Sequence, residues 1–402
     1  MESIAIVDMP SRLNKFGGEA RIAASLFKGL RRSFNTYYIG YGTSYLSENE
    51  RGVILPSNGG AISKSLRNKS ISESAIARLA YNALVVRRLH GIDKEAIARK
   101  MKEANPSVII SNSVQDMPLL IYLKAAGIKS KMVYIDHSSI SSELNDWYFS
   151  KKAMPLTIGS GVRALSVNGA LRNFFRFFDA VVALNKEQYN SIRRFTEDVV
   201  YIPNGISVSL GHNAAIEKSI KERYSIGSKM VVIYVGRMFE RQKNVSTLIK
   251  AFKGSNADAV LMLVGEGPSL SDYIRIAGGD RRIVFAGGVE EKLLQYFYNI
   301  ADIFVLPSFW EGFSLTVLEA SAHRLPMLLS EGAYIEDLRS YRIPTFKTGS
   351  IESLRKSLMM LISSKAARAS ASRESARIAL DFTEERMLRS YERLISQLHG
   401  GN

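Results

Sequence analysis

The stretch Phe309-Trp-Glu-Gly-Phe-Ser-Leu-Thr-Val-Leu-Glu-Ala320 follows a short apolar run, Ala301-Asp-Ile-Phe-Val-Leu-Pro307. The apolar run predicts a buried strand, and the Gly-Phe-Ser turn predicts the start of a helix. Glu311 is then expected on the loop after the carboxyl end of the strand, and Glu319 within the helix. Because ligands of open α/β sheets bind at this edge, the stretch predicts both an α/β fold and a ligand site.

The predicted helix start offers backbone groups as well as side chains. The amides of Phe313, Ser314 and Leu315 would be the free N–H groups of the helix, which suit a phosphate or another anion. The carboxylates of Glu311 and Glu319 would accept hydrogen bonds from hydroxyls on either side of that anion. A nucleotide sugar has this arrangement, since a diphosphate joins its sugar to its ribose.

Short apolar runs alternate with amphipathic stretches along the chain, which is typical of parallel sheets with crossover helices. Two such series predict two Rossmann-like, doubly wound domains, and a chain of 402 residues also exceeds one ordinary core. We expect an N-terminal domain at 1–205, a C-terminal domain at 206–380 and a C-terminal helix within 381–402. The predicted strands are Ile4–Val7, Tyr37–Ile39, Val108–Ile110, Met132–Ile135, Ala180–Ala183, Val199–Ile202, Met230–Val235, Val260–Val264, Ile283–Phe285 and Ile303–Leu306.

The composition excludes several kinds of site. The chain has no cysteine, so disulfides, thiolate metal sites and cysteine nucleophiles are excluded. It also has no His-x-x-x-His pair and no Asp-x-Asp, and the latter argues against a metal-bridged nucleotide-sugar site. We therefore predict no metal ion and no cofactor.

The net charge of +16 is unevenly distributed. Residues 1–200 hold 28 Lys and Arg against 17 Asp and Glu, so the first half of the chain is the basic one. An excess of this kind suits nucleic acid, an acidic membrane surface or an anionic substrate, and it also suits a solubilising surface with no dedicated partner.

Two observations bear on location. The first residues, Met-Glu-Ser-Ile-Ala-Ile-Val-Asp8, place acids where a signal peptide has a basic segment, so we expect no secretion signal. The chain also lacks an apolar run of the ~20 residues that a membrane-spanning helix needs. We expect a cytoplasmic protein, with peripheral association at the inner face of the membrane as an alternative.

Two cations are expected near the same sheet edge. Gly236-Arg237 follows the predicted strand Met230–Val235, and Lys243-Asn244 begins the next predicted helix. Arg offers a planar fork of donors and Lys a mobile point charge, which together suit the two phosphates of a diphosphate. A pair of ordinary surface cations is the alternative interpretation.

Five blocks of sequence, in order, resemble one family. They are Ile202-Pro-Asn-Gly-Ile206, Val235-Gly-Arg with Lys243-Asn, Leu263-Val-Gly-Glu-Gly-Pro268, Ala301-Asp-Ile with Pro307-Ser, and Glu311-Gly-Phe-Ser-Leu with Glu319-Ala. Together they resemble the family-four retaining glycosyltransferases of the GT-B fold, also called glycosyl transferases group 1. In the first domain the resemblance rests on the Gly17-Gly18 loop and on His137 after a central strand.

The resemblance implies two Rossmann-like domains facing a central cleft. The N-terminal domain would bind the acceptor, the C-terminal domain would bind the nucleotide sugar, and the last helix would pack back on the N-terminal domain. Arg237, Lys243, Glu311 and His137 are the implied catalytic residues. The implied donor-binding residues are Gly17, Gly18, Gly236, Arg237, Lys243, Gly312, Phe313, Ser314, Leu315 and Glu319.

Each role follows from the family. Glu311 would contact the hydroxyls of the transferred sugar, and Glu319 those of the ribose. Arg237 and Lys243 would hold the diphosphate and stabilise the charge that develops on it. His137 would approach the sugar, although a buried histidine satisfied by a neighbouring serine is the structural alternative.

The implied reaction is hexosyl transfer with retention of configuration. No second carboxylate stands out as a nucleophile of the kind that retaining glycosidases use. The family instead implies front-face attack without a metal, in which the departing diphosphate accepts the proton of the acceptor. The co-substrate would be a UDP- or GDP-sugar, and the acceptor a glycan or a lipid-phosphate-linked glycan of polysaccharide or glycolipid biosynthesis.

One segment suits either contact with a membrane or packing in the core. Gly161–Phe178 places basic residues among Leu and Phe side chains, as an interfacial helix does. Phe174 and Phe178 are four positions apart and equally suit the core. Residues 57–75, rich in Ser, Asn and Gly, are predicted to be an exposed loop.

Other functions compete with a glycosyltransferase. A sugar-nucleotide epimerase can share the two-domain fold, and a basic nucleic-acid-binding protein would explain the charge, although the basic residues are dispersed. We therefore expect no nucleic acid partner. A dehydrogenase is disfavoured because no Gly-x-Gly-x-x-Gly follows the first strand.

Two departures from the family pattern are visible. Arg237 and Lys243 are six positions apart, one more than the pattern suggests, so the loop must still return Lys243 to the site. His323-Arg324-Leu325-Pro326 replaces a small residue and a glycine at the end of the helix that holds Glu319. The helix thus lacks its left-handed glycine, and either the Arg324 side chain caps it or the loop is altered.

Overall fold

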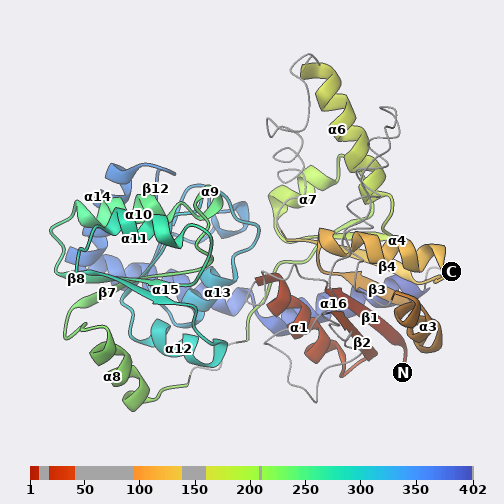
Figure 1. The fold of residues 1–402 in the computed structure, drawn as a ribbon, viewed down its shortest axis with the longest axis horizontal. Helices are drawn as coiled ribbons and strands as arrows, with labels where there is room; N and C mark the ends of the chain where they lie inside the picture. The colour runs from red at the N-terminus through yellow and green to blue at the C-terminus, as the bar shows by residue number, and fades with distance from the viewer. Residues whose placement is uncertain (9–17, 41–93, 138–159, 208–210, 401–402) are drawn as a thin grey trace, which may run out of the picture. The chain divides into compact units, whose positions relative to one another are not determined.

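The computed structural model describes residues 1–8, 18–40, 94–137, 160–207 and 211–400, without the side chains of 160–167. The chain forms two compact units (Figure 1). The first comprises Met1–Ala183, Tyr189–Tyr201 and Leu388–Asn402, and the second comprises Leu184–Gln188 and Ile202–Met387. The expected loop at 57–75 and Gly17 lie outside the described residues.

The first unit contains a parallel six-stranded sheet in the order β2-β1-β3-β4-β5-β6. The chain winds to one side of β1 and then to the other, so the order reverses between β1 and β3. The strands are β1 Ser3–Asp8, β2 Asn35–Gly40, β3 Val108–Ser111, β4 Lys131–Asp136, β5 Ala180–Ala183 and β6 Val199–Tyr201. The helices are α1 Gly18–Leu30, α3 Lys94–Ala104, the short 3₁₀ turn η2 Val114–Asp116, α4 Met117–Ala125, α6 Ser160–Phe175 and α7 Lys186–Ile192.

The second unit contains another parallel six-stranded sheet, in the order β12-β11-β10-β7-β8-β9. Counted within the unit this is the 3-2-1-4-5-6 order of dinucleotide-binding folds, with the reversal between β7 and β10. The strands are β7 Met230–Val235, β8 Ala259–Val264, β9 Ile283–Gly287, β10 Ile303–Leu306, β11 Met327–Ser330 and β12 Thr345–Phe346. The helices are α8 Ala214–Arg223, α9 Glu240–Lys243, α10 Val245–Lys253, α11 Leu270–Ala277, α12 Glu291–Asn299, α13 Leu315–Ala322, the 3₁₀ turn η3 Glu336–Leu338, α14 Ile351–Ser363 and α15 Lys365–Asp381. The last helix, α16 Glu384–Gly400, begins in this unit and belongs to the first unit from Leu388 onward.

The predicted α/β class with two Rossmann-like, doubly wound domains is confirmed. The ten predicted strands are all present, because each is an apolar run in a parallel sheet. Most are buried, and β6 and β9 are largely half-buried. Sequence reasoning missed β11 and β12, which have four and two residues.

The C-terminal helix α16 contacts the first helix of the chain within the first unit. A side chain at Gly29 of α1 would lie 2.4 Å from Leu388 Cδ1, so this glycine permits the close approach. Ser33 Oγ donates to Glu392 Oε1 at 2.5 Å, and His399 Nδ1 lies 2.9 Å from Glu2 Oε1. These contacts place the last turns of the chain with the first sheet.

The end of α6 is packed into the core of the first unit. The ring of Phe178 stacks on that of Tyr134, and Phe174 meets Tyr134 edge to face, both with ring centroids 5.1 Å apart. Arg172 and Arg176 on the other face are exposed. Phe174 and Phe178 therefore pack in the core, which was one of the two interpretations of this segment. Within the described residues no helix is long and apolar enough to cross a membrane.

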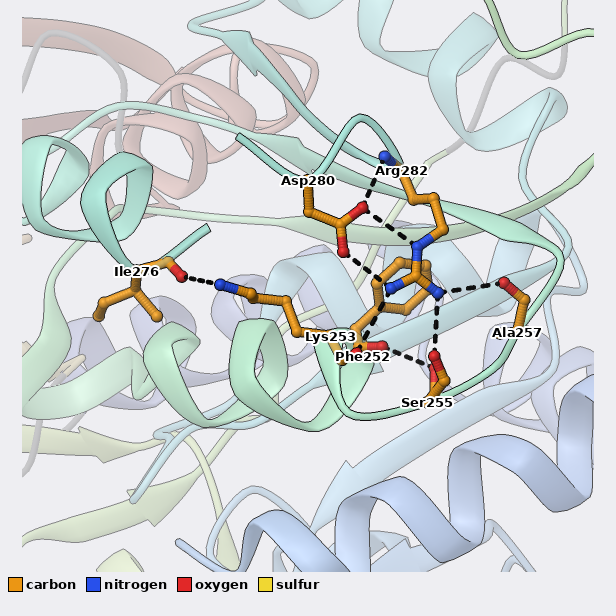
Figure 2. A network of polar contacts seen from close by, with 7 residues as sticks. All are labelled: Phe252, Lys253, Ser255, Ala257, Ile276, Asp280 and Arg282. Atoms are coloured by element: carbon orange, nitrogen blue, oxygen red, sulfur yellow. Dashed lines mark hydrogen bonds and ion pairs between the residues drawn. The ribbon is translucent and has the colours of Figure 1, made fainter. Parts of the chain in front are cut away.

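Arg282 fastens the amino-terminal edge of the second sheet (Figure 2). Its guanidinium donates to both carboxylate oxygens of Asp280, at 3.1 and 2.7 Å, and to the carbonyls of Ser255 and Ala257, at 2.9 and 3.3 Å. It also lies over the ring of Phe252. The Arg282 hydrogen bond lowers the pKa of the Asp280 carboxyl. Because these residues precede β8 and β9, the anchor lies at the edge of the sheet opposite to the candidate site.

The end of α13 shows how the missing glycine is replaced. Arg324 itself adopts the left-handed conformation, with φ of +55°. Its N–H donates to Ser321 O and the N–H of Leu325 donates to Ala320 O, both at 2.9 Å, which are the bonds of a left-handed helix termination. The backbone of Arg324 thus ends the helix in the left-handed conformation, which neither the side-chain cap nor the altered loop of the sequence analysis had described.

Candidate functional site

Two groups of predicted site residues follow the carboxyl ends of β7 and β10. Gly236 and Arg237 come directly after β7, and the loop with Glu311 comes after β10. These strands are neighbours, and the strand order reverses between them. Parallel α/β sheets bind ligands at such a reversal, because the loops diverge there and leave a crevice.

Lys243 and Glu311 form an ion pair at this position. Lys243 Nζ lies 2.7 Å from Glu311 Oε1 and 3.0 Å from Oε2. Their side chains are only 16% and 6% exposed, so water screens the pair weakly. The two residues are 68 positions apart, and the sequence assigned them to different parts of a ligand. In the structure they hold each other, and a ligand at this point meets both charges together.

The backbone around Lys243 explains how the longer loop returns it. Residues Glu240–Lys243 form the short helix α9, which Asn244 ends in the left-handed conformation with φ of +49°. Asn244 Nδ2 donates to Pro307 O at 3.1 Å, and Phe309 N donates to Gln242 O at 2.7 Å. These bonds fasten the turn with Lys243 to the loop with Glu311. Asn244 is therefore a positioning residue that the sequence showed only as a neighbour of Lys243.

The side chain of Arg237 lies apart from the Lys243–Glu311 ion pair. Its side chain is exposed, and its guanidinium lies 5.0 Å from the centroid of the Phe239 ring. Its carbonyl accepts a hydrogen bond of 2.9 Å from the buried Tyr234 hydroxyl. Within the described part of the chain, no hydrogen bond or ion pair joins Arg237 to Lys243 or Glu311. Its predicted role with a phosphate therefore remains a proposal.

The loops after β7 and β8 approach each other through glycines. Gly236 N donates to Val264 O at 3.0 Å. Gly265 has φ of +132°, and a Cβ added to it would lie 2.0 Å from Gly236 O. Only glycine fits both the backbone conformation and the space. The block Leu263-Val-Gly-Glu-Gly-Pro268 thus brings backbone close to the crevice.

Hydrogen bonds to backbone carbonyls fix the residues that precede α13. Ser314 is the N-cap, and its side chain accepts no capping hydrogen bond from the helix. The carbonyls of Gly312 and Phe313 accept hydrogen bonds of 2.9 Å from Asn185 Nδ2 and Asn204 Nδ2. The two amides therefore fix the peptides that lead into the helix, beginning at Leu315. Asn204 belongs to a block that the sequence singled out, whereas nothing in the sequence pointed to Asn185.

Glu319 is buried within α13 and already has a side-chain donor. It is 5% exposed, and Tyr298 Oη donates to its Oε2 at 2.5 Å. The ring of Tyr298 stacks on His323, with centroids 5.1 Å apart. Burial lowers the pKa of His323 to about 4, and its Nδ1 lies 2.9 Å from Asn299 Oδ1. Tyr298 is a second positioning residue that the sequence did not reveal.

Two of the predicted residues of the first unit, Gly18 and His137, are among those that the structure describes. Gly18 is the exposed first residue of α1. His137 follows β4, and its Nε2 lies 2.8 Å from Asn112 Oδ1. Burial lowers the pKa of His137 to about 3, so its ring is neutral. The serines that the structural alternative invoked lie outside the described residues, and Asn112 is the partner that the structure provides.

The described residues were also compared with the requirements of a metal site. No group of three His, Asp or Glu side chains in residues 1–8, 18–40, 94–137, 168–207 and 211–400 is arranged to hold a metal ion.

Comparison with known proteins agrees with the geometry of the second unit. Residues 229–356 match the family model described as "Glycosyl transferases group 1". This range includes β7, Lys243, Glu311 and Glu319. The match spans less than half of the chain, so it characterises the second unit.

Curated relatives resemble part of the chain. It is 34% identical over 155 residues to "Uncharacterized glycosyltransferase MJ1607" of Methanocaldococcus jannaschii, covering 36% of this chain and 40% of the relative. It is 27% identical over 141 residues to a "GDP-mannose-dependent alpha-(1-6)-phosphatidylinositol monomannoside mannosyltransferase" of Mycobacterium tuberculosis, covering 32% and 37%. The similarity thus spans about two fifths of the length of these relatives.

A solved structure shares the fold of the whole chain. The Anabaena protein HepE, in a complex with UDP and glucose, matches with a TM-score of 0.73 and 16% identity, covering 99% of this chain and 100% of HepE. At this identity the match shows the GT-B fold alone. It agrees with the two Rossmann-like sheets described above.

Proposed function

We propose that this chain is a retaining glycosyltransferase that moves a sugar from a nucleotide sugar to a glycan or a lipid-linked acceptor. The observation that carries the proposal is the Lys243–Glu311 ion pair. It lies where the strand order of the second sheet reverses, beside the start of α13 and inside the segment that matches group 1 glycosyltransferases. Two partial relatives of the chain are named as glycosyltransferases.

The donor would bind on the second unit. The amides of Phe313, Ser314 and Leu315 and the cations Arg237 and Lys243 supply the positive field that a diphosphate needs. This arrangement suits the anion because no side-chain cap of Ser314 competes for the start of the helix. Gly236 and Gly312 would allow the phosphates to approach the backbone closely.

The carboxylates would recognise hydroxyls. Glu311 would accept a hydrogen bond from the transferred sugar while Lys243 reaches the phosphate beside it. Glu319 would accept from the ribose while Tyr298 fixes its orientation. Both carboxylate oxygens of Glu311 are already engaged by Lys243 Nζ, at 2.7 and 3.0 Å. The pair therefore favours an anchoring role for Glu311 over the nucleophilic role of glycosidase carboxylates.

The reaction would proceed by front-face attack without a metal. The bond between the anomeric carbon and the phosphate oxygen breaks, and its electron pair stays with the diphosphate. The acceptor hydroxyl oxygen bonds to the anomeric carbon on the same face, and its proton passes to the departing phosphate oxygen. Lys243 and Arg237 would stabilise the charge on that diphosphate. His137 and the Gly17-Gly18 loop would act from the first unit.

The acceptor would bind to the first unit, whose domain carries most of the positive charge. One relative is named for a phosphatidylinositol mannoside acceptor, and another, from Escherichia coli, for a diphosphoundecaprenol acceptor. We propose a lipid-phosphate-linked glycan at the cytoplasmic face of the membrane, where the basic surface would assist peripheral binding.

The first experiment is a thermal-shift screen of UDP- and GDP-sugars with the full chain. A donor that binds only the folded state raises the unfolding temperature. The active donor is then incubated with lipid-linked acceptors, and NMR of the product gives its anomeric configuration. Inversion would contradict front-face attack. Conversion of the nucleotide sugar to its epimer without an acceptor would favour an epimerase. A lack of stabilisation by all the nucleotide sugars would remove the proposed function.

A further inference from the structure

A chain of hydrogen-bonded polar side chains, three of them buried, crosses the carboxyl ends of the first four strands in the order of the first sheet. Tyr38 of β2 donates its hydroxyl to Asp8 Oδ2 at 2.7 Å. Asp8 ends β1, and its Oδ1 accepts from Asn112 Nδ2 at 3.2 Å. Asn112 follows β3, and its Oδ1 lies 2.8 Å from Nε2 of His137, which follows β4. The link between Asp8 and Asn112 spans the reversal of strand order between β1 and β3.

The orientation of the Asn112 amide follows from its neighbours. Nδ2 lies 2.8 Å from the main-chain oxygen of Glu19, which can only accept a hydrogen bond. If the amide were turned around, its oxygen would face this carbonyl and its nitrogen would face His137. Asn112 therefore presents its oxygen to His137.

The backbone of Asn112 is held as firmly as its side chain. Its N–H donates to Asp116 Oδ2 at 2.9 Å, and that oxygen also accepts from Ser113 N at 2.9 Å and Ser111 Oγ at 3.0 Å. Asn112 is fully buried. Its amide oxygen is thus fixed in place before any ligand arrives.

The fixed oxygen determines where the proton of His137 lies. A neutral imidazole has one N–H donor and one acceptor nitrogen. Because Asn112 Oδ1 accepts, Nε2 carries the proton, and Nδ1 keeps its lone pair. The low pKa of His137 agrees, since burial keeps the ring neutral. The described residues provide no hydrogen-bond partner for Nδ1.

We propose that Asn112, fixed by Asp8 and the Glu19 carbonyl, is a positioning residue that holds His137 in its Nε2–H form, so that Nδ1 accepts a hydrogen bond from a hydroxyl of the donor sugar. The inference rests on the proposed function for the identity of that ligand. It has a consequence for specificity, because an acceptor nitrogen recognises a hydroxyl and does not attract a phosphate oxygen.

The tautomer is tested by long-range proton–nitrogen NMR of the full chain labelled on histidine. His137 is assigned by comparison with His137→Gln. We expect the wild type to show Nε2 protonated and Nδ1 bare. Asn112→Leu should lose this preference, whereas Asp8→Asn should keep it, because the Glu19 carbonyl still orients Asn112. A protonated Nδ1 in the wild type would overturn the positioning role, and this spectrum decides even if Asn112→Leu does not fold.

The ligand is tested by comparing two probes, the nucleotide sugar found in the screen and its nucleoside diphosphate alone. Asn112→Leu and His137→Ala should raise KM for the nucleotide sugar about threefold to tenfold, the value of one hydrogen bond. The affinity for the nucleoside diphosphate should not change. Equal weakening of both probes would overturn the assignment to a sugar hydroxyl. If no nucleotide sugar binds while Nε2 is protonated, the proposed function fails and the hydroxyl assignment with it, but the tautomer stands.

Discussion

In the first unit, the reversal of strand order is crossed by a chain of hydrogen bonds that runs from Tyr38 to the neutral ring of His137. In the second unit, the ammonium of Lys243 pairs with the carboxylate of Glu311 beside the reversal of strand order. The two sheets share parallel strands but differ in strand order. The difference teaches that the same kind of sheet edge can hold a neutral hydrogen-bonded chain or an ion pair. Under the proposed function, the first would meet a sugar hydroxyl and the second a charged diphosphate.

The strongest test of this contrast removes the charge in the second unit. Lys243→Met should lower turnover by about 10²-fold or more, since it removes a cation at the leaving group. Tyr38→Phe, which removes the outermost link in the first unit, should lower turnover far less. Steady-state kinetics with the identified donor measure both.

Loss of the Lys243 charge also leaves Glu311 unpaired in a buried place, which lowers stability. The double variant Lys243→Met with Glu311→Gln separates the two effects, because it restores the balance of charge but not the cation. Lys250→Ala, an exposed lysine on α10, is the control. Recovery of turnover in the double variant would contradict the proposed role of Lys243.

The next effect concerns the backbone beside the charged site. Gly265→Ala should destabilise the second unit. A strained backbone alone costs about 1–3 kcal/mol. We expect a larger loss, because the added Cβ also meets Gly236 O. Gly279→Ala is the matched control, since Gly279 has φ of +76° but nothing within 4 Å of its Cβ. Chemical denaturation gives both values. Equal losses would show that the loops after β7 and β8 do not constrain each other.

A smaller effect is expected at Glu319. Tyr298→Phe removes the hydroxyl that donates to Glu319 Oε2. KM for the donor should rise about threefold to tenfold with little change in kcat, because one hydrogen bond that orients the carboxylate is lost. Tyr296→Phe on the same helix serves as the control. A fall in kcat at constant KM would mean that Glu319 acts in the chemical step.

The smallest effect is a gain in stability at the end of α13. A left-handed backbone costs a residue other than glycine about 1–2 kcal/mol, and Arg324→Gly removes this cost. Glycine in turn costs about 0.5–1 kcal/mol, because it loses more chain entropy on folding. We expect a net gain of about 0.5 kcal/mol in the free energy of unfolding. Arg324→Ala keeps the strain and should show no gain. A gain in both variants would place the effect in the arginine side chain.

The sequence predicted most of the framework on which the site stands. Buried strands of parallel sheets are continuous apolar runs, so Met230–Val235 and Ile303–Leu306 were visible without a structure, and Glu311 could be placed after the second of them. The family blocks then singled out Lys243 and Glu319. The strand order within each sheet was not visible, because pairing depends on contacts between runs that are distant along the chain.

The partners of these residues were beyond the reach of sequence patterns. Asn185, Asn112 and Tyr298 are single polar residues in no repeating pattern, and their neighbours lie 127, 25 and 21 positions away. A hydrogen bond depends on distances of a few tenths of an ångström, which only the packed chain sets.

By itself, the sequence determined the class of fold, the absence of cysteine chemistry and the place of Glu311 and Glu319 relative to a strand and a helix. Only the tertiary structure decided that Lys243 pairs with Glu311, that Tyr298 holds Glu319 and that Asn112 faces His137. The physical reason is that apolar periodicity is a local property of the chain, whereas charge pairing and proton placement arise where separate strands end side by side.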